Sequence, residues 1–211
     1  VDMSATLRYV VDTSATLATE NRDPTMSAIT LPDTLTGDYT IDASHSRIGF
    51  VARHAMVTKV RGSFNDFTGS IHLDAANPAA STAQVSIIVA SIDTRNEQRD
   101  GHLRTNDFFD APTFPKITFK STSVQQLDDG KFAVTGDLSI KDVTKAITVA
   151  FEFAGLATDP YGNVRAGYEG TATLNRSDYG VSFNAALDTG GVLVSDKINL
   201  ELDVSAIKNP A

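Results

Sequence analysis

The chain lacks cysteine and tryptophan entirely. Without cysteine it can form no disulfide, use no thiol nucleophile and bind no metal through sulfur. No apolar run approaches the roughly 18 residues that a membrane-spanning helix needs, so we expect no stable membrane insertion. Residues 1–30 lack the basic and apolar regions of an export signal. The sequence therefore leaves the location open: cytoplasmic for the chain as given, and periplasmic or secreted if a signal has been removed.

Positive charge is also scarce. The 211 residues include 18 Lys and Arg against 26 Asp and Glu, which gives a formal net charge of -8 and a pI near 4.9. A basic stripe is the usual footprint of nucleic-acid binding, and clusters of cations are typical of docking on anionic lipids. We therefore expect no nucleic-acid partner and no docking on anionic headgroups, and a neutral or cationic partner instead.

The standard catalytic and nucleotide-binding motifs are missing too. The sequence contains no G-x-S-x-G, no H-E-x-x-H, no P-loop and no G-x-G-x-x-G. His102 lies near Asp100 and Asp107, but Asp100 and His102 are two positions apart and do not share a helix face. We therefore expect no metal site, no cofactor and no catalytic residue. His54 is interpreted either as a hydrogen-bonded core histidine or as a contact to the polar head of a ligand.

One helix interrupts a sequence that otherwise has the pattern of β-structure. Thr94 and Glu97 match the capping box, in which the Thr side chain bonds a free N–H of the first turn and the Glu reaches back. This motif predicts a helix that begins there and, weakened by Gly101, frays by Thr105. The expected interval is 95–105.

The residues in and after this helix have two interpretations. Leu103, Phe108 and Phe109 form an apolar cluster at the helix exit, either as a plug for one end of a β-core or as the lid or wall of an apolar cavity. Arg99-Asp100 with Arg104 is interpreted as an ion-paired helix surface.

From Asp38 onward, apolar residues alternate with polar ones at the period of a β-strand. The runs lie in 47–54, 62–71, 85–92, 116–121, 132–140, 147–153, 166–174 and 198–204. Turn signals separate them, among them Asp128-Asp129-Gly130 and Asp159–Asn163. Eight or so long antiparallel strands describe a closed barrel or a two-sheet sandwich, and the strand length favours the barrel. We therefore predict an all-β fold, an eight-stranded antiparallel barrel with one short helix after the third or fourth strand.

The predicted barrel domain spans residues 37–208. Residues 1–36 are rich in Ser, Thr and Ala and are predicted to form a flexible N-terminal arm. An alternative is that this arm pairs with and covers a sheet edge.

Small residues recur at positions that face inward in this pattern. They are Ala52, Ser91, Gly136, Gly170 and Ala172. Two interpretations stay open: they leave room for a ligand in the lumen, or they fit the taper of a filled barrel against the phenylalanines opposite.

Several short blocks together resemble one known family. They are His45-Ser46, Ile48-Gly49-Phe50, Arg53-His54, Val60–Phe64, Ser91–Thr94, Arg99–Arg104, Asp107–Phe109, Phe114–Phe119, Gly136–Ile140 and Asn175–Gly180. In this order they are similar to the YceI-like family of polyisoprenoid-binding proteins, from about Asp38 to Lys208. The resemblance implies a lipocalin-like, eight-stranded antiparallel barrel that holds an isoprenoid chain or isoprenoid quinone in its lumen.

Three functions follow as hypotheses. The first is binding, storage or transport of an isoprenoid lipid, an isoprenoid quinone or another elongated apolar small molecule. The alternatives are a cofactor-free enzyme acting on an apolar metabolite, with His54 or an inward acid as base, and a stress-related interaction protein with a filled barrel. A homodimer is compatible with the sequence. The predicted ligand-binding residues are Phe50, His54, Phe64, Ile87, Val89, Leu103, Phe108, Phe109, Phe119, Val134, Leu138, Val149, Phe151, Tyr168 and Ala172.

Overall fold

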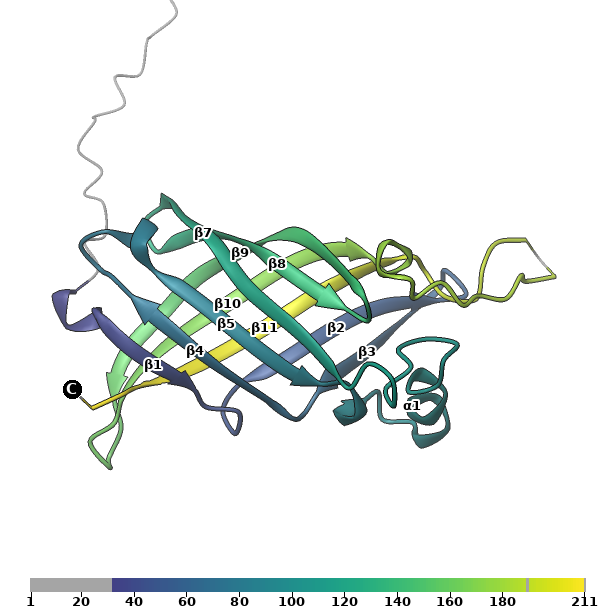
Figure 1. Ribbon diagram of the computed structural model, residues 1–211, viewed down its shortest axis with the longest axis horizontal. Helices are drawn as coiled ribbons and strands as arrows, with labels where there is room; N and C mark the ends of the chain where they lie inside the picture. Colours follow the sequence, from purple (N-terminus) through teal and green to yellow (C-terminus); the bar gives the residue numbers. More distant parts are fainter. Residues whose placement is uncertain (1–31, 189, 211) are drawn as a thin grey trace, which may run out of the picture.

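The computed structural model describes residues 32–188 and 190–210, and they form an antiparallel β-barrel with one α-helix (Figure 1). The strand segments are β1 (Gly37–Ile41), β2 (Arg47–His54), β3 (Thr58–Phe64), β4 (Phe67–Leu73), β5 (Thr82–Ile88), β6 (Ile92–Asp93), β7 (Lys116–Asp128), β8 (Lys131–Ile140), β9 (Val143–Thr158), β10 (Val164–Asn175) and β11 (Lys197–Lys208). The helical elements are α1 (Glu97–Leu103) and the 3-10 turns η1 (Asp33–Leu35), η2 (Pro78–Ala80), η3 (Val89–Ser91) and η4 (Arg176–Tyr179).

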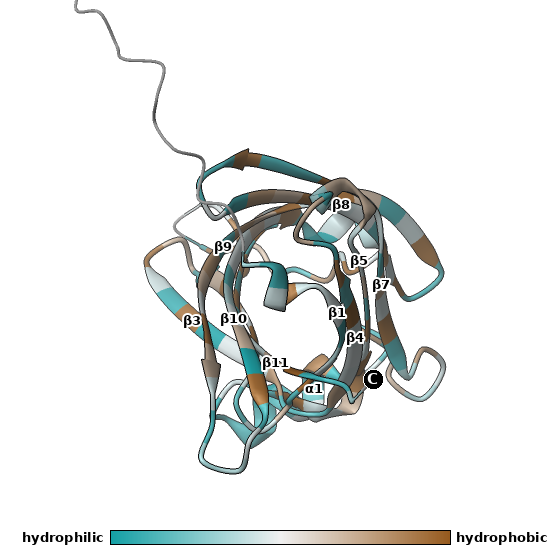
Figure 2. Ribbon diagram, turned by 90° about the vertical axis from the view of Figure 1, so that its left-hand side faces the viewer, coloured by the Kyte–Doolittle hydropathy of each residue, from teal (hydrophilic) through white to brown (hydrophobic). Residues whose placement is uncertain are grey.

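The segments close into a ring of eight strands, of which the first three are interrupted. β1 and β2 form the first strand, and both pair with the same edge of β11. β3 and β4 form the second, in which β4 pairs with β1 and β3 with β2. β5 and β6 form the third, in which β5 pairs with β4 and β6 with β3. β7 to β11 complete the ring, which is visible in the view along the barrel (Figure 2). The predicted eight-stranded antiparallel barrel, with one helix after the third full strand, is therefore confirmed.

η1 lies directly before the predicted barrel domain of residues 37–208 and contacts it. Residues 1–31 of the predicted arm lie outside the described residues. In the part of the arm that is described, Leu35 is only 1% exposed, and its carbonyl accepts a hydrogen bond of 2.8 Å from the buried Tyr39 hydroxyl. Leu35 is therefore packed into the barrel from η1, while the residues on either side of it are exposed.

The helix lies inside the predicted interval, but the predicted cap is wrong. α1 begins at Glu97, and the side chain of Asn96 accepts the N–H of Arg99 at 2.9 Å. Thr94 does not cap the helix, because its hydroxyl and N–H both donate to the carboxylate of Asp100. Asparagine is as good an N-cap as threonine, and Asn96 caps the helix because it directly precedes the first helical residue.

The predicted ion-paired helix surface is also wrong. Asp100 is buried and accepts from Thr94, while the Arg99 guanidinium donates to the hydroxyl and carbonyl of Thr94. Arg104 donates to the carbonyl of Ile92 at 2.9 Å. These side chains hold the segment between β6 and α1 against the barrel instead of facing water.

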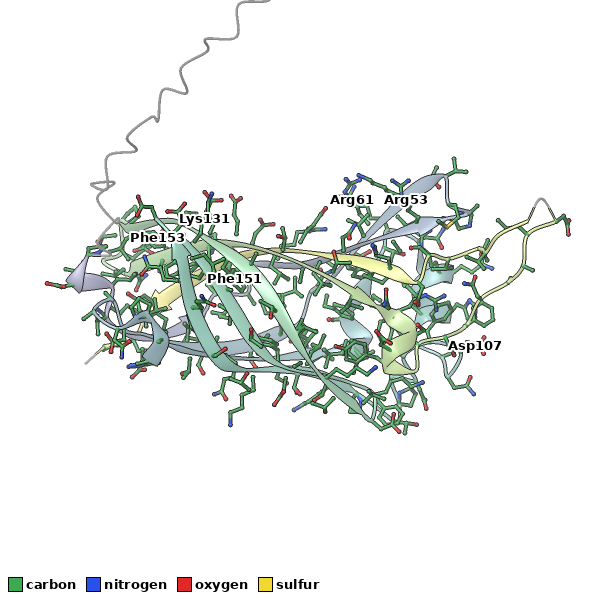
Figure 3. All side chains as sticks on the ribbon, turned by 90° about the horizontal axis from the view of Figure 1, so that it is seen from above. Arg53, Arg61, Asp107, Lys131, Phe151 and Phe153 are labelled. Atoms are coloured by element: carbon green, nitrogen blue, oxygen red, sulfur yellow. The ribbon has the colours of Figure 1, made fainter. Side chains whose placement is uncertain are left out.

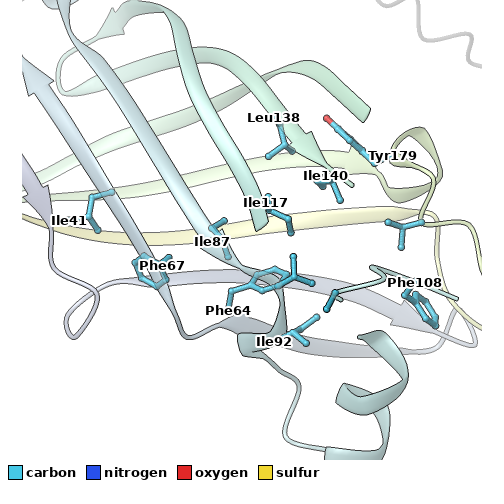
Figure 4. Packing of buried hydrophobic residues seen from close by; sticks show 13 residues of the cluster. Ile41, Phe64, Phe67, Ile87, Ile92, Phe108, Ile117, Leu138, Ile140 and Tyr179 are labelled. Carbon is cyan, nitrogen blue, oxygen red and sulfur yellow. The ribbon is translucent and has the colours of Figure 1, made fainter. Parts of the chain in front are cut away.

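Two apolar clusters fill different parts of the barrel. The larger cluster lies toward the end that carries α1, called here the α1 end (Figure 4), and includes Phe64, Ile92, Phe108 and Tyr179. The smaller cluster lies toward the opposite end, which carries η1 and η2 and is called the η2 end, and includes Leu35, Tyr39 and Phe132.

Candidate ligand-binding cavity

An apolar cavity of about 180 Å³ occupies the lumen between the two clusters and extends to the η2 end. Its wall is formed by Leu35, Ile48, Ile71, Leu73, Asp74, Ala75, Pro78, Ser81, Thr82, Ala83, Val85, Ile87, Phe119, Val124, Phe132, Val134, Leu138, Ile147, Val149, Phe151, Tyr168, Leu200, Leu202 and Val204. Strand alternation explains this lining, because every second residue of a barrel strand faces inward. On β9, for example, Ile147, Val149 and Phe151 line the cavity, while Thr148 and Ala150 are exposed.

Two phenylalanines of the wall lie over glycines of a neighbouring strand. A Cβ added to Gly170 would overlap the ring of Phe151, and one added to Gly136 would lie 2.5 Å from Cζ of Phe119. These glycines therefore leave room for an aromatic ring and not for a ligand. The small inward residues had two interpretations, room for a ligand or a fit to opposing phenylalanines. At Gly136 and Gly170 the structure has the second, because each glycine faces a phenylalanine ring.

Polar groups of the wall gather at the η2 end, and they are engaged with one another. The Asp74 carboxylate accepts the N–H groups of Ala76 and Asn77, at 3.1 and 2.8 Å. The Asp74 N–H donates to the hydroxyl of Ser81 at 2.9 Å. The mouth is therefore a fixed polar turn around η2, and no Lys, Arg or His is among the lining residues of the described chain.

Tyr168 is the polar residue within the apolar part of the wall. Its ring packs against Phe153 at 5.4 Å between centroids. Burial, with a smaller contribution from Tyr39, raises the pKa of the Tyr168 hydroxyl, so this group is a neutral donor at any physiological pH. Within residues 32–188 and 190–210 its hydroxyl has no hydrogen-bond partner, which leaves it free to bond a group inside the lumen.

The predicted site residues divide into two sets. Those that line the cavity are Ile87, Phe119, Val134, Leu138, Val149, Phe151 and Tyr168. The others lie elsewhere. Phe64 and Val89 are buried in the cluster of the α1 end, and Phe50 packs against that cluster. Ala172 is on β10, in register with Leu200 of β11, and is not among the residues that line the cavity.

His54 does not face the lumen as its strand pattern indicates. It ends β2, is exposed, and forms an isolated bridge with Val194. The cause is geometric, because the β2–β3 hairpin extends beyond the α1 end of the barrel, where no interior remains (Figure 1).

The residues at the helix exit act as a plug and not as the mouth of the cavity. Phe108 is buried, Leu103 and Phe109 pack against the same cluster, and the Phe109 ring lies 5.9 Å from that of Phe64. None of the three lines the cavity, which opens at the other end.

Sequence reasoning missed the residues that form the mouth, namely Leu35, Leu73, Asp74, Ala75, Pro78, Ser81 and Thr82. Asp74 and the Asn77-Pro78 pair are turn signals, so a turn between two strands was detectable there. Its position at the open end of the barrel was not, because the sequence does not show which end the aromatic residues fill.

Two further properties of the described residues bear on function. In this part of the chain, no three His, Asp or Glu residues gather into a group that could hold a metal ion. Among the same residues, no helix has the length and apolar character required to cross a membrane.

Comparison with known proteins agrees with this architecture. A UPF0312 protein of Staphylococcus aureus strain N315 is 40% identical over 165 residues, which cover 78% of this chain and 94% of the relative. The crystal structure of Burkholderia cenocepacia BcnA matches with a TM-score of 0.70 at 27% identity, covering 78% of this chain and 98% of that one. The Campylobacter jejuni YCEI protein matches with a TM-score of 0.66 at 32% identity, covering 75% and 90%.

A more distant structure has the same fold. A polyisoprenoid binding domain from Saccharophagus degradans, implicated in plant cell wall breakdown, matches with a TM-score of 0.62 at 16% identity, over 81% of this chain and 98% of that one. The family model of the YceI-like domain matches residues 39–206, which span the barrel from β1 to β11. The chain therefore belongs to the YceI-like family.

Proposed function

We propose that the protein binds an isoprenoid lipid or isoprenoid quinone in the lumen and stores or carries it. The observation that carries this proposal is the wall of the cavity, which is almost entirely aliphatic and aromatic side chains inside a closed barrel. An apolar chain needs no specific hydrogen bonds there and gains from leaving water. The polyisoprenoid binding domain of S. degradans, which shares the fold, supports the same ligand class.

The size of the cavity limits how much of the ligand it holds. A cavity of about 150 Å³ lined by Leu, Ile and Phe binds benzene, which has six carbons. The 180 Å³ found here therefore accommodates one or two five-carbon isoprene units without rearrangement. Each unit contributes at most roughly 3 to 4 kcal/mol at ~0.8 kcal/mol per CH₂. A longer chain requires movement of wall residues such as Phe119 and Phe151, or extends through the mouth beside η2.

The polar end of the ligand fits an uncharged group better than a phosphate. The wall has the Asp74 carboxylate at its mouth and no cationic side chain among its described residues. The free Tyr168 hydroxyl is a donor for a carbonyl, as in a quinone, or for an alcohol oxygen.

Binding is favoured over catalysis because the wall lacks an acid–base pair. None of the four histidines lines the cavity, and Asp74 is engaged by the turn at η2. Proton transfer to or from a bound molecule needs a group within hydrogen-bond reach whose pKa lies near the working pH, and Tyr168 does not meet this condition.

The test is organic extraction of the purified full chain followed by mass spectrometry, together with binding of a short prenyl quinone. Val149→Phe places a ring in the cavity, and we expect it to abolish retention of the quinone. Ala150→Phe is the matched control, because it adds a ring on the same strand but on the exposed face. Equal retention by both variants, or no binding by the wild type, would mean that the barrel is not a carrier of such molecules.

A further inference from the structure

The β2–β3 hairpin carries like charges directly opposite one another. Arg53 is in register with Lys59, and Val51 with Arg61, so these four side chains share the face that points away from the lumen. Arg53 and Arg61 lie together at the outer surface in Figure 3. Like charges in directly opposed positions destabilise a strand pair. The arrangement therefore costs stability, which the fold alone does not explain.

No acid of the described residues forms an ion pair with any of these three cations. Within the described residues, Arg53, Lys59 and Arg61 are exposed and form no ion pair, whereas the neighbouring Arg47 lies 3.8 Å from Glu201. The adjacent loop of residues 184–194 contributes one acid, Asp188. Residues 47–64 contain no Asp or Glu, so the outer face of the hairpin is positive on a protein of net charge -8, with Asp93 in register with Ser63 at one edge and Glu201 in register with Gly49 at the other.

The tip of the same hairpin is apolar and projects into solvent. Met56 is 53% exposed and Val57 77%, and Val192 of the adjacent loop is 39% exposed. The loop fixes the tip in place, because the N–H of Ala55 donates to the carbonyl of Leu193 and Arg53 is bonded at both backbone groups to Ser195. Three of the five large hydrophobic residues that are exposed in the described chain gather here.

The other exposed apolar side chains have different surroundings. Leu127 precedes Asp128 and Asp129 at the β7–β8 turn, and Tyr161 lies beside Asp159 in the β9–β10 turn. Acids flank both of these turns, whereas cations flank Met56 and Val57. Lys131 also follows the β7–β8 turn, but of these three turns only the β2–β3 hairpin, residues 47–64, carries cations and contains no Asp or Glu.

We propose that the β2–β3 hairpin is a docking element for an anionic lipid surface, with Met56 and Val57 entering the interface and Arg53, Lys59 and Arg61 contacting lipid phosphates. An apolar tip bordered by cations is complementary to a negatively charged bilayer surface. The net charge does not prevent this, because charges more than about 8 Å away are screened at physiological ionic strength. The proposal differs from the expectation drawn from overall charge, that the chain does not dock on anionic headgroups, and the vesicle experiment decides between them.

This docking site is separate from the lumen. The hairpin lies at the α1 end, whereas the cavity opens at the η2 end, so a docked barrel presents its mouth away from the hairpin (Figure 1). Docking of the hairpin on lipid is therefore independent of ligand binding in the lumen, and different assays measure the two properties.

The test is co-sedimentation of the full chain with vesicles of phosphatidylcholine alone and with vesicles containing phosphatidylglycerol. We expect binding to the anionic vesicles only, and its loss as salt is raised. Replacing Arg53, Lys59 and Arg61 by Gln should lower the partition coefficient about fivefold per cation, or about 100-fold for the three. The matched control replaces Lys116, Lys120 and Lys131 by Gln, which gives the same net charge at three exposed positions of β7 and β8.

A second pair of variants tests the tip. Met56→Ser with Val57→Ser should weaken vesicle binding, whereas Leu127→Ser should not. Thermal unfolding checks that all variants fold. The proposal is overturned if the wild type does not bind anionic vesicles, if neutral vesicles bind as well, or if the two triple variants lose affinity equally. Retention of a single-stranded oligonucleotide in place of vesicles would assign the patch to nucleic acid and would also overturn it.

Discussion

The two ends of the barrel are built from the same strands, yet one is filled and the other is hollow. At the α1 end, residues from outside the strands enter the lumen: Phe108 and Phe109 follow α1, and Val181 and Phe183 follow η4. At the η2 end, the described connections contribute one buried hydrophobic residue, Leu35 of η1, and the small side chains of Ala75 and Pro78 at the cavity wall. The difference teaches that the hollow depends less on small residues in the strands than on side chains delivered by the connections.

A buried arginine secures the connection at the filled end. Arg176 is 7% exposed and donates to the carbonyls of Ser195, Val181 and Val194. It thereby ties the segment that carries Val181 and Phe183 over the lumen. The Phe183 ring lies 5.1 Å from Phe108 and 5.0 Å from His102, which joins this segment to α1. In the described chain, smaller polar groups hold the turn at η2: Asp74, Ser81 and the Thr36 hydroxyl, which accepts the N–H of Ala75 at 3.0 Å.

The largest expected difference between the ends concerns removal of an aromatic ring. Phe64→Ala should destabilise the protein by about 3 to 5 kcal/mol, because it opens a cavity in a packed cluster where Phe64 contacts Phe50 and Phe109. Phe151→Ala should cost clearly less, because its ring already borders empty space. Chemical denaturation of both variants measures this. Equal losses would show that the cavity is collapsed in solution and that the two ends do not differ.

A smaller effect is expected where a ring covers a glycine. Gly170→Ala should cost about 1 to 3 kcal/mol and reduce ligand retention, because its new Cβ pushes the Phe151 ring into the lumen. Gly167→Ala on the same strand is the control, since its nearest neighbour would be Cβ of Ala154 at an ordinary 3.5 Å. If both variants bind the prenyl quinone like the wild type, Phe151 does not border the ligand.

The cap of α1 separates stability at the filled end from binding at the hollow end. Asn96→Ala should lower the free energy of unfolding by about 1 kcal/mol, because an N–H of the first turn loses its acceptor. Glu97→Ala should change it by no more than about 0.5 kcal/mol. Quinone retention should be unchanged in both. If Glu97→Ala lowered the free energy of unfolding more than Asn96→Ala, the capping box of Thr94 and Glu97 that the sequence predicts would be supported instead.

The smallest expected effect lies on the outer surface at the η2 end and depends on pH. Arg165 donates to Asp42 and Asp159, at 2.6 and 2.9 Å. The pKa of Asp42 is lowered by its hydrogen bonds to Ser44 and then Arg165, and that of Asp159 by its bonds to Asn163 and to Arg165. Both carboxylates thus have lower pKa values when folded than when unfolded.

The sign of the pH dependence follows from these shifts. The stabilisation is fully present above the unfolded pKa of about 3.9 and is lost as the pH falls through the lower folded values. Arg165→Gln should therefore lower the melting temperature at pH 7, and the gap to the wild type should narrow below about pH 4. A gap that stays constant with pH would show that Arg165 acts through packing and not through charge.

The sequence predicted the barrel well because period-two alternation is a local signal. β7 to β11 each follow an alternating run, and Gly130, with a φ of 68°, sits in the predicted turn between β7 and β8. The signal that predicted the helix was also local in sequence. Its cap was predicted at the wrong residue, because Thr94 and Asn96 are both good caps and only the buried Asp100 decides between them.

The candidate site was harder to predict because it depends on contacts that are distant in sequence. Alternation indicates that Val149 and Phe64 both face inward, but it does not show that one borders a cavity while the other is covered by Phe109. His54 shows the same limit, because it continues the pattern of β2 past the end of the barrel. The contribution of Leu35 had no periodic signal at all.

The pairing of β11 has a consequence for how the molecule is made. One edge of β11 pairs with β10, and the other pairs with β1 and β2, near the start of the described chain. During synthesis, the free edges of β10 and of β1 and β2 therefore stay unpaired until residues 197–208 have left the ribosome. Exposed strand edges are prone to aggregation, and contacts between distant parts of a chain form slowly. Without β11, the ring of strands is open between β10 on one side and β1 and β2 on the other, so the lumen is not closed.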